Sequence, residues 1–92
     1  MYKVQYSTKF RRDLRKFEKD SNFKTKWLKD ILWLLVKNKP LDGRYRNHKL
    51  KNKFHDCMEC HIKPDLLLIY SVDNNKKEIY LYRLGSHSEL FG

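Results

Sequence analysis

Histidine is the residue type in this chain best suited to acid and base catalysis. Imidazole has an unperturbed pKa close to neutral pH, so one side chain can both accept and donate a proton. Three of the four histidines lie where regular structure is expected to break: His48, His61 and His87. Asp65 follows His61 across Lys63–Pro64. Three histidines beside a carboxylate on a basic protein indicate RNA cleavage or nucleotide handling, whereas one histidine alone would more often be an ordinary surface residue.

The apolar run after Asp65 is expected to hold these groups in place. Residues 66–70 (LLLIY) show no polar alternation, which predicts a central strand buried on both faces. Residues 73–76 predict a hairpin turn and residues 78–84 the last strand. In an antiparallel meander, the end of one strand and the start of the next lie at the same edge. The groups expected to converge at that edge are His61, Asp65, Arg83 and His87, with His48 nearby.

Apolar spacing predicts two helices before the sheet. Residues 10–17 carry one apolar stripe, and Ser7 is placed to cap the helix that they form. Residues 23–37 predict a second helix, with Ser21 or Asn22 as its N-cap. A break of a few residues between them makes a helical hairpin.

Two further segments alternate apolar and polar residues and predict strands. Residues 2–6 suggest a short edge strand, and residues 55–62 a strand that leads into His61. The predicted fold is therefore α+β. A small antiparallel sheet, made of the N-terminal strand and a C-terminal meander of three or four strands, is covered by the helical hairpin. The chain forms one domain over residues 1–92.

The chain is strongly basic. It carries 21 Lys and Arg against 11 Asp and Glu, a net charge of +10 with a pI near 9.7. Residues 37–53 hold seven Lys and Arg against one Asp, or +6 of that charge. Such a field favours nucleic acid, an acidic protein or an anionic membrane as partner. Arg46, Lys49 and Lys51 are expected to contact RNA phosphates, and the simpler interpretation is a solvated basic loop.

The two cysteines form the sequence CMECH, which matches the CxxCH signature of covalent haem attachment. Haem attachment of this kind needs export, and the N-terminal residues do not resemble a signal peptide. Two cysteines supply half of an all-cysteine zinc site, although His48, His55 or His61 could add ligands. We expect neither haem nor metal, and assign both cysteines a structural role.

No segment is expected to cross a membrane. The longest apolar run, Ile31–Val36, is far shorter than the span of about 20 residues that a bilayer requires. A membrane-surface role for the basic helices is disfavoured because a sheet follows that they must cover. The sequence therefore predicts a cytoplasmic protein.

Three segments resemble the YafQ-like toxins of the RelE/ParE superfamily, which belong to bacterial type II toxin–antitoxin modules. They are NHKL at residues 47–50, ECHIKPD at residues 59–65 and RLGSHSELF at residues 83–91. The resemblance runs nearly end to end. It implies a RelE-like fold and a ribosome-dependent mRNA endoribonuclease that inhibits translation. It also implies a cognate antitoxin, expected to be acidic, that covers the site.

The resemblance also implies roles for individual residues. His48, His61, Asp65 and His87 match catalytic positions, with Arg83 as a phosphate contact and Phe91 as a residue that stacks on or orients a base. The implied chemistry uses no metal or other cofactor: one group deprotonates a ribose 2′-hydroxyl and another protonates the leaving 5′-oxygen. His87 and His61 are the expected pair, with their roles unassigned.

One residue departs from the family pattern, and one alternative function stays open. Leu66 stands where some relatives carry a tryptophan, so the resemblance does not extend to base stacking there. The alternative function is a basic binding module of the same fold, either a gyrase-targeting toxin or an RNA-binding protein, without nuclease activity.

Overall fold

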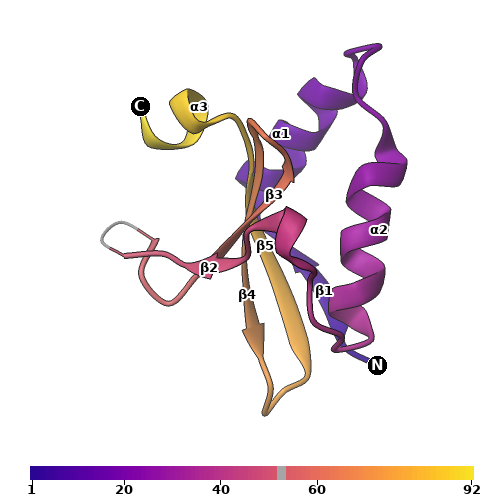
Figure 1. Ribbon diagram of the computed structural model, residues 1–92, viewed down its shortest axis with the longest axis vertical. Coiled ribbons are helices and arrows are strands. Elements are labelled where there is room, and N and C mark those ends of the chain that lie inside the picture. Colours follow the sequence, from indigo (N-terminus) through magenta and orange to yellow (C-terminus); the bar gives the residue numbers. More distant parts are fainter. Residues whose placement is uncertain (52–53) are drawn as a thin grey trace.

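The computed structural model describes residues 1–51 and 54–92, and it places α1 and α2 on one face of a sheet and the short α3 on the other (Figure 1). Five strands form one sheet in the order β1-β5-β4-β3-β2. The elements follow one another as β1 (Lys3–Tyr6), α1 (Thr8–Glu18), α2 (Thr25–Val36), the 3-10 helix η1 (Gly43–Tyr45), β2 (His48–Lys49), β3 (Met58–Lys63), β4 (Leu66–Asp73), β5 (Glu78–Gly85) and α3 (His87–Phe91). The predicted α+β architecture with a helical hairpin is therefore confirmed.

The sheet is mixed rather than wholly antiparallel as predicted. Strands β3, β4 and β5 form the expected antiparallel meander. Strand β1, however, pairs in parallel with β5, from Lys3 opposite Glu78 to Tyr6 opposite Leu81. The helical hairpin separates β1 from the rest of the sheet, and such a long crossover allows a parallel pair where a tight turn would not.

The first helix begins where the sequence predicts. The Oγ of Ser7 accepts a hydrogen bond from the backbone N–H of Phe10 at 2.9 Å and donates one to the carbonyl of Tyr82 at 2.7 Å. One side chain therefore caps α1 and ties it to β5.

The predicted start and N-cap of the second helix are wrong. Helix α2 begins at Thr25 with Lys24 as N-cap, and no side chain among the described residues caps it. The residues between the two helices form a turn that Asp20 closes. The carboxylate of Asp20 accepts a hydrogen bond from the N–H of Asn22 at 2.9 Å, and its carbonyl accepts one from the N–H of Phe23 at 3.1 Å. Local side-chain bonds of this kind compete with helix formation.

Strand β4 is buried on both faces, as its unbroken apolar sequence predicts. Leu68 packs under the helices, in one cluster with Phe10 and Ile31. Leu67 and Ile69 point to the other face, where they pack with Cys57 and Leu90 of α3. Each of the fully buried aliphatic side chains contributes about 1.5–3 kcal/mol. The strand is therefore a rigid support for Asp65 at its start.

The basic segment, residues 37–53, contains more regular structure than the solvated loop of the simpler interpretation. It contains η1 and β2, and the hydroxyl of the buried Tyr70 donates to Asn47 Oδ1 at 2.6 Å. Leu50 packs against the smaller cluster and donates its N–H to the carbonyl of Cys57 at 2.9 Å. Residue Lys53 of this segment lies outside the described residues.

The strand predicted over residues 55–62 starts later, at Met58. Asp56 adopts a left-handed backbone with φ of 71°, and the N–H of Cys57 closes a turn onto the carbonyl of Phe54. Cys57 and Cys60 are free and buried. Burial, and then the charge of Glu59, raise the pKa of the Cys60 thiol to about 12, which suits the structural role predicted for it. Within the described ranges, no helix is both long and apolar enough to span a bilayer.

Candidate active site

Three imidazole rings converge on one side of the sheet, as the sequence predicts. His48 comes from β2, His61 from β3 and His87 from the first position of α3. The ring centroids of His48 and His61 are 6.2 Å apart, and those of His61 and His87 are 5.6 Å apart. The middle ring is the least exposed: the side chain of His61 is 13% exposed, while those of His48 and His87 are 49% and 55% exposed. The middle ring is held in the protein and the outer two face solvent.

Asp65 holds His87 through two contacts. Its Oδ1 accepts from the backbone N–H of His87 at 3.0 Å and lies 2.9 Å from the ring Nδ1. A carboxylate can only accept, so the imidazole proton of a neutral His87 lies on Nδ1 and the lone pair on Nε2. The backbone N–H is the main cause, and the ring the second, of a lowered pKa for Asp65. The pair is the arrangement in which an acid orients a histidine base.

The local sequence explains why His87 is presented here. Ser86 begins α3 with a capping box: its Oγ accepts from the N–H of Glu89, and the Glu89 side chain accepts from the N–H of Ser86. His87 is the first helical residue, so its own N–H has no partner within the helix. That N–H donates its hydrogen bond to Asp65 instead.

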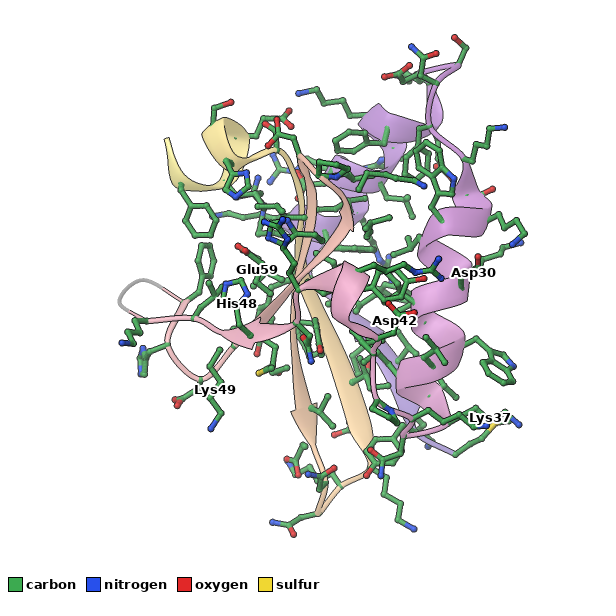
Figure 2. All side chains as sticks on the ribbon, in the orientation of Figure 1. Asp30, Lys37, Asp42, His48, Lys49 and Glu59 are labelled. Atoms are coloured by element: carbon green, nitrogen blue, oxygen red, sulfur yellow. The ribbon has the colours of Figure 1, made fainter. Side chains whose placement is uncertain are left out.

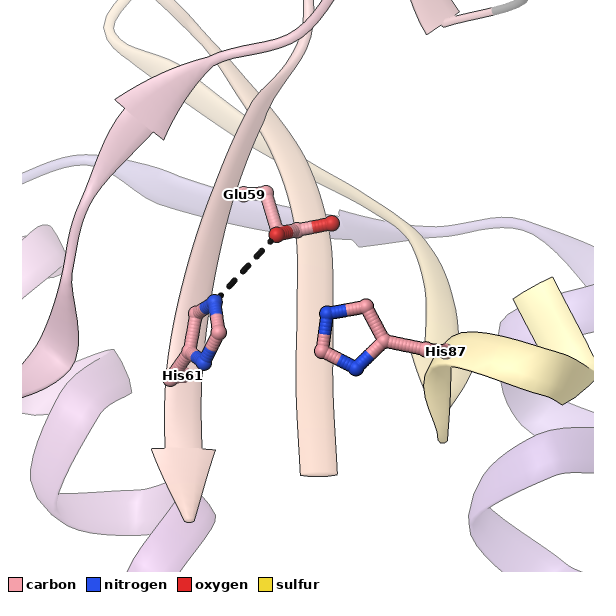
Figure 3. Close-up of side chains that lie close together, drawn as sticks. All are labelled: Glu59, His61 and His87. Atoms are coloured by element: carbon pink, nitrogen blue, oxygen red, sulfur yellow. Dashed lines mark ion pairs between the residues drawn. The ribbon is translucent and has the colours of Figure 1, made fainter. Parts of the chain in front are cut away.

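Glu59 is part of the cluster, and the sequence did not identify it as a site residue. It is 3% exposed, and its Oε1 lies 3.4 Å from the Nε2 of both His48 and His61 (Figures 2 and 3). These are ion-pair distances when the imidazoles are protonated, and are too long for strong hydrogen bonds. Its Oε2 is buried and has no hydrogen-bond partner in the part of the chain that the structure describes. A buried carboxylate in this state is costly, which makes Glu59 a candidate functional residue.

A signal for Glu59 was present in the sequence. Glu59 and His61 are two residues apart in β3, and alternate residues of a strand lie on the same face. The adjacent Cys60 and Ile62 belong to the core on the opposite face. Antiparallel pairing then sets His48 directly opposite Glu59. That last contact depends on β2, which the sequence did not predict.

His48 is fixed from both sides of its ring. Its Nδ1 donates to the carbonyl of Arg46 at 2.7 Å, while its Nε2 faces Glu59. Arg46 supplies that carbonyl from a left-handed conformation with φ of 46°, at the end of η1. The side chains of Arg46, Lys49 and Lys51 are exposed, and Figure 2 shows that Lys49 points away from His48, as expected for consecutive residues of a strand.

Arg83 makes its described contacts with α1 rather than with the histidines. Its Nε donates to Asp13 Oδ2 at 2.8 Å and its Nη2 to Asp13 Oδ1 at 3.2 Å. Asp13 Oδ2 also accepts from the N–H of Leu84 at 2.9 Å. A phosphate contact by Arg83 therefore remains a prediction, and it requires the guanidinium to exchange Asp13 for the phosphate.

Phe91 lies on the same face of α3 as His87, four residues further on. Its side chain is 47% exposed, and its ring meets that of Phe54 edge to face with centroids 5.8 Å apart. The adjacent Leu90 is the residue that anchors α3 in the core. Phe91 is thus available to a ligand at the cluster.

Three groups of the cluster could also hold a metal ion. One ligand atom each from Glu59, His61 and His87 lies within 4.8 Å of the other two (Figure 3). Two imidazoles and a carboxylate suit zinc or copper. The same side chains that could transfer protons could therefore be occupied by a metal.

Known proteins resemble this chain over its whole length. Residues 2–92 match the family described as the bacterial toxin of type II toxin–antitoxin system, YafQ. The mRNA interferase toxin YafQ of Escherichia coli strain B / BL21-DE3 is 32% identical over 90 residues, covering 97% of this chain and 95% of that protein.

Solved structures extend the likeness to three dimensions. A metal-bound toxin from Helicobacter pylori is 42% identical, with a TM-score of 0.91 over 99% of this chain and 100% of that one. The E. coli DinJ–YafQ complex contains a chain that is 30% identical, with a TM-score of 0.88 and full coverage of both chains.

Proposed function

Because the chain belongs to the YafQ family of toxins from type II toxin–antitoxin systems, we propose that it is an endoribonuclease that cuts mRNA on the ribosome and so inhibits translation. The observation that carries this proposal is the pairing of Asp65 with His87 beside His61 and Glu59. The name of the E. coli relative, mRNA interferase toxin, supports the same activity. A ribosome-bound substrate implies action in the cytoplasm.

His87 is the proposed general base. With Asp65 on its Nδ1, the ring offers the Nε2 lone pair to the ribose 2′-hydroxyl. The deprotonated 2′-oxygen attacks the adjacent phosphorus and the bond from phosphorus to the 5′-oxygen breaks. The products are a 2′,3′-cyclic phosphate on one fragment and a 5′-hydroxyl on the other.

His61 is the proposed general acid. Its protonated form pairs with Glu59, and its ring lies next to that of His87. It delivers a proton to the leaving 5′-oxygen, so that one histidine takes a proton and the other gives one. His48, on the other side of Glu59, stabilises negative charge on the phosphate together with the exposed cations of the basic segment.

An acidic antitoxin is the proposed partner. The E. coli relative is seen in complex with DinJ, and the charge of +10 on this chain favours a negatively charged protein. A partner that covers the row of histidines would exclude RNA from them. In the test below, adding such a partner should restore intact mRNA.

The test is cleavage of ribosome-bound mRNA by the wild type and by His87→Ala. Loss of general base catalysis predicts a rate about 10²–10⁴-fold lower with an unchanged thermal unfolding midpoint. His55→Ala is the matched control, because His55 is exposed, pairs with Asp56 and lies outside the cluster. It should cut as the wild type does.

Two results would overturn the proposal. Cleavage by His87→Ala at the wild-type rate would remove the histidine from the chemistry. Intact mRNA with the wild type, together with slowed DNA supercoiling by gyrase, would assign the chain to the gyrase-targeting alternative.

A further inference from the structure

A second hollow adjoins the histidine row. An open pocket of about 390 Å³ lies between α2, η1 and the end of β3. Figure 1 shows η1 facing α2 across this region, with α3 on the other side of β3. The volume falls within the range of about 300–1,000 Å³ that small-molecule sites occupy. The catalytic scheme above uses none of its space.

The lining of this pocket is positively charged. Arg44, Arg46 and Lys63 contribute three cations. Asp30 is the acidic residue in the described lining, and it already pairs with Lys26 Nζ at 2.9 Å. An anionic ligand is therefore favoured over a cationic or neutral one.

The pocket also offers aromatic rings to a ligand. The Nζ of Lys63 lies 4.5 Å from the centroid of the Trp27 ring, and the Cζ of Arg44 lies 4.7 Å from that of Tyr45. Tyr45 is buried, whereas Trp27 is half-buried and keeps part of its ring accessible. A cation and an aromatic face side by side are what proteins use to bind one nucleotide, the cation taking the phosphate and the ring stacking on the base.

Two residues connect this pocket to the catalytic cluster. His61 lines the pocket and lies next to His87 in the row of rings. Arg46 lines it too, and its carbonyl accepts the hydrogen bond from His48 Nδ1. A ligand in the pocket therefore lies beside the reacting phosphate rather than at a remote site.

We propose that this pocket holds one nucleotide of the RNA next to the scissile phosphodiester. The base stacks on Trp27, and its phosphate lies among Arg44, Arg46 and Lys63. Lys63 leaves the ring face as the base arrives and pairs with the phosphate instead. This inference rests on the proposed function for the identity of the polymer, and it names the part of the site that selects where the RNA is cut.

The first test compares Trp27→Ala with Trp33→Ala in the cleavage of ribosome-bound mRNA. Trp33 is a matched control: it lies on the same helix, is 54% exposed and has lysines over its ring, but does not line the pocket. Loss of one stacked base predicts a KM about 5- to 150-fold higher for Trp27→Ala with little change in kcat. Trp33→Ala should match the wild type.

A second substitution separates binding from folding, because Trp27 also packs against the core. Trp27→Phe keeps an aromatic face and should retain a KM within a few-fold of the wild type. An equal rise in KM for Trp27→Phe and Trp27→Ala, with lower thermal midpoints for both, would make the effect structural and overturn the proposal.

Fluorescence tests the stacking directly. The chain has two tryptophans, so Trp33→Phe leaves Trp27 as the reporter and Trp27→Phe leaves Trp33. A short RNA with one 2′-deoxyribose at the cut position, which cannot react, should quench Trp27 in a saturable way and leave Trp33 unchanged. Quenching of neither tryptophan, or of both equally, would refute the nucleotide site.

The outcomes distinguish this inference from the proposed function. If His87→Ala is inactive while Trp27→Ala has the wild-type KM and cut sites, the pocket proposal fails and the nuclease stands. If the wild type cuts no RNA, the proposed function fails, and the fluorescence result alone decides whether the pocket binds a nucleotide.

Discussion

Glu59 is the carboxylate of the cluster whose environment is least favourable to a charge. It is buried, two imidazoles lie at 3.4 Å from one of its oxygens, and the other oxygen lacks a partner among the described residues. Burying a charge with incomplete pairing costs stability, so we expect Glu59 to serve the two histidines beside it.

Glu59→Gln should therefore separate stability from activity. The amide removes a poorly compensated buried charge, so the free energy of unfolding should stay within about 1 kcal/mol of the wild type or rise. The cleavage rate should fall, because protonated His61 loses its partner. Denaturant unfolding and single-turnover cleavage measure the two effects. A variant that is strongly destabilised yet fully active would show that Glu59 is merely structural.

Metal binding should inhibit the enzyme rather than support it. A Cu²⁺ or Zn²⁺ ion held by His61 and His87 would occupy the lone pairs that proton transfer requires. Cleavage should persist in excess EDTA and fall when Cu²⁺ is added, and Glu59→Gln should need more Cu²⁺ for the same inhibition. Loss of cleavage in EDTA, restored by the metal, would contradict a mechanism carried by side chains alone.

The sequence could predict the histidines but not all of their partners. Residue type and breaks in the hydrophobic pattern identified His48, His61, Asp65 and His87. Arg83 was expected among them because the sequence placed it in the last strand. The sequence did not indicate which side chain it would pair with. Its partner, Asp13, comes from α1, and side-chain pairing between distant elements does not follow from local patterns.

At the scale of elements, α3 is a short helix whose position depends on its contacts with the rest of the chain. It has five residues, too few to be stable as a helix alone. Leu90 anchors it in the core, Asp65 accepts from His87, and Lys16 pairs with Glu89. Figure 1 shows how α3 sits against the sheet at the end of β5, so these contacts decide where His87 lies.

The contacts of α3 predict acid sensitivity. Asp65 has a pKa below its ordinary 3.8, chiefly because of the His87 N–H, and Glu89 has one below its ordinary 4.5, chiefly because of Lys16. A carboxylate whose pKa is lower in the folded state contributes its full stabilisation above the unfolded pKa. That contribution is lost as the pH falls through the folded pKa.

Thermal unfolding should therefore show a midpoint that falls below about pH 4.5, where these two carboxylates begin to protonate in the unfolded chain. The double variant Asp65→Asn, Glu89→Gln should flatten the pH dependence in this window. An unchanged slope would assign the acid sensitivity to other groups.

The element boundaries show where sequence patterns fail. The apolar run of β4 and the N-cap of α1 were predictable because burial and capping act locally. The N-cap of α2 and the parallel pairing of β1 were not. The former depends on a turn that Asp20 forms, and the latter on how the helical hairpin crosses the sheet.

At the scale of the whole molecule, charge and site lie together. Arg46 supplies the carbonyl that holds His48, and the pocket beside His61 is lined by Arg44, Arg46 and Lys63. A polyanion drawn to this surface would meet the catalytic groups. Composition predicted the class of partner, but the pocket between α2 and η1 exists only once both elements are packed.

The 2′-hydroxyl is the atom on which the proposed chemistry depends. A ribosome-bound mRNA with one 2′-deoxyribose at its main cut position tests it most directly. Cleavage should disappear at that position and continue elsewhere, and the unmodified mRNA should yield a 2′,3′-cyclic phosphate and a 5′-hydroxyl. Undiminished cleavage at the deoxyribose would contradict the account, because the base His87 would then have no nucleophile to activate.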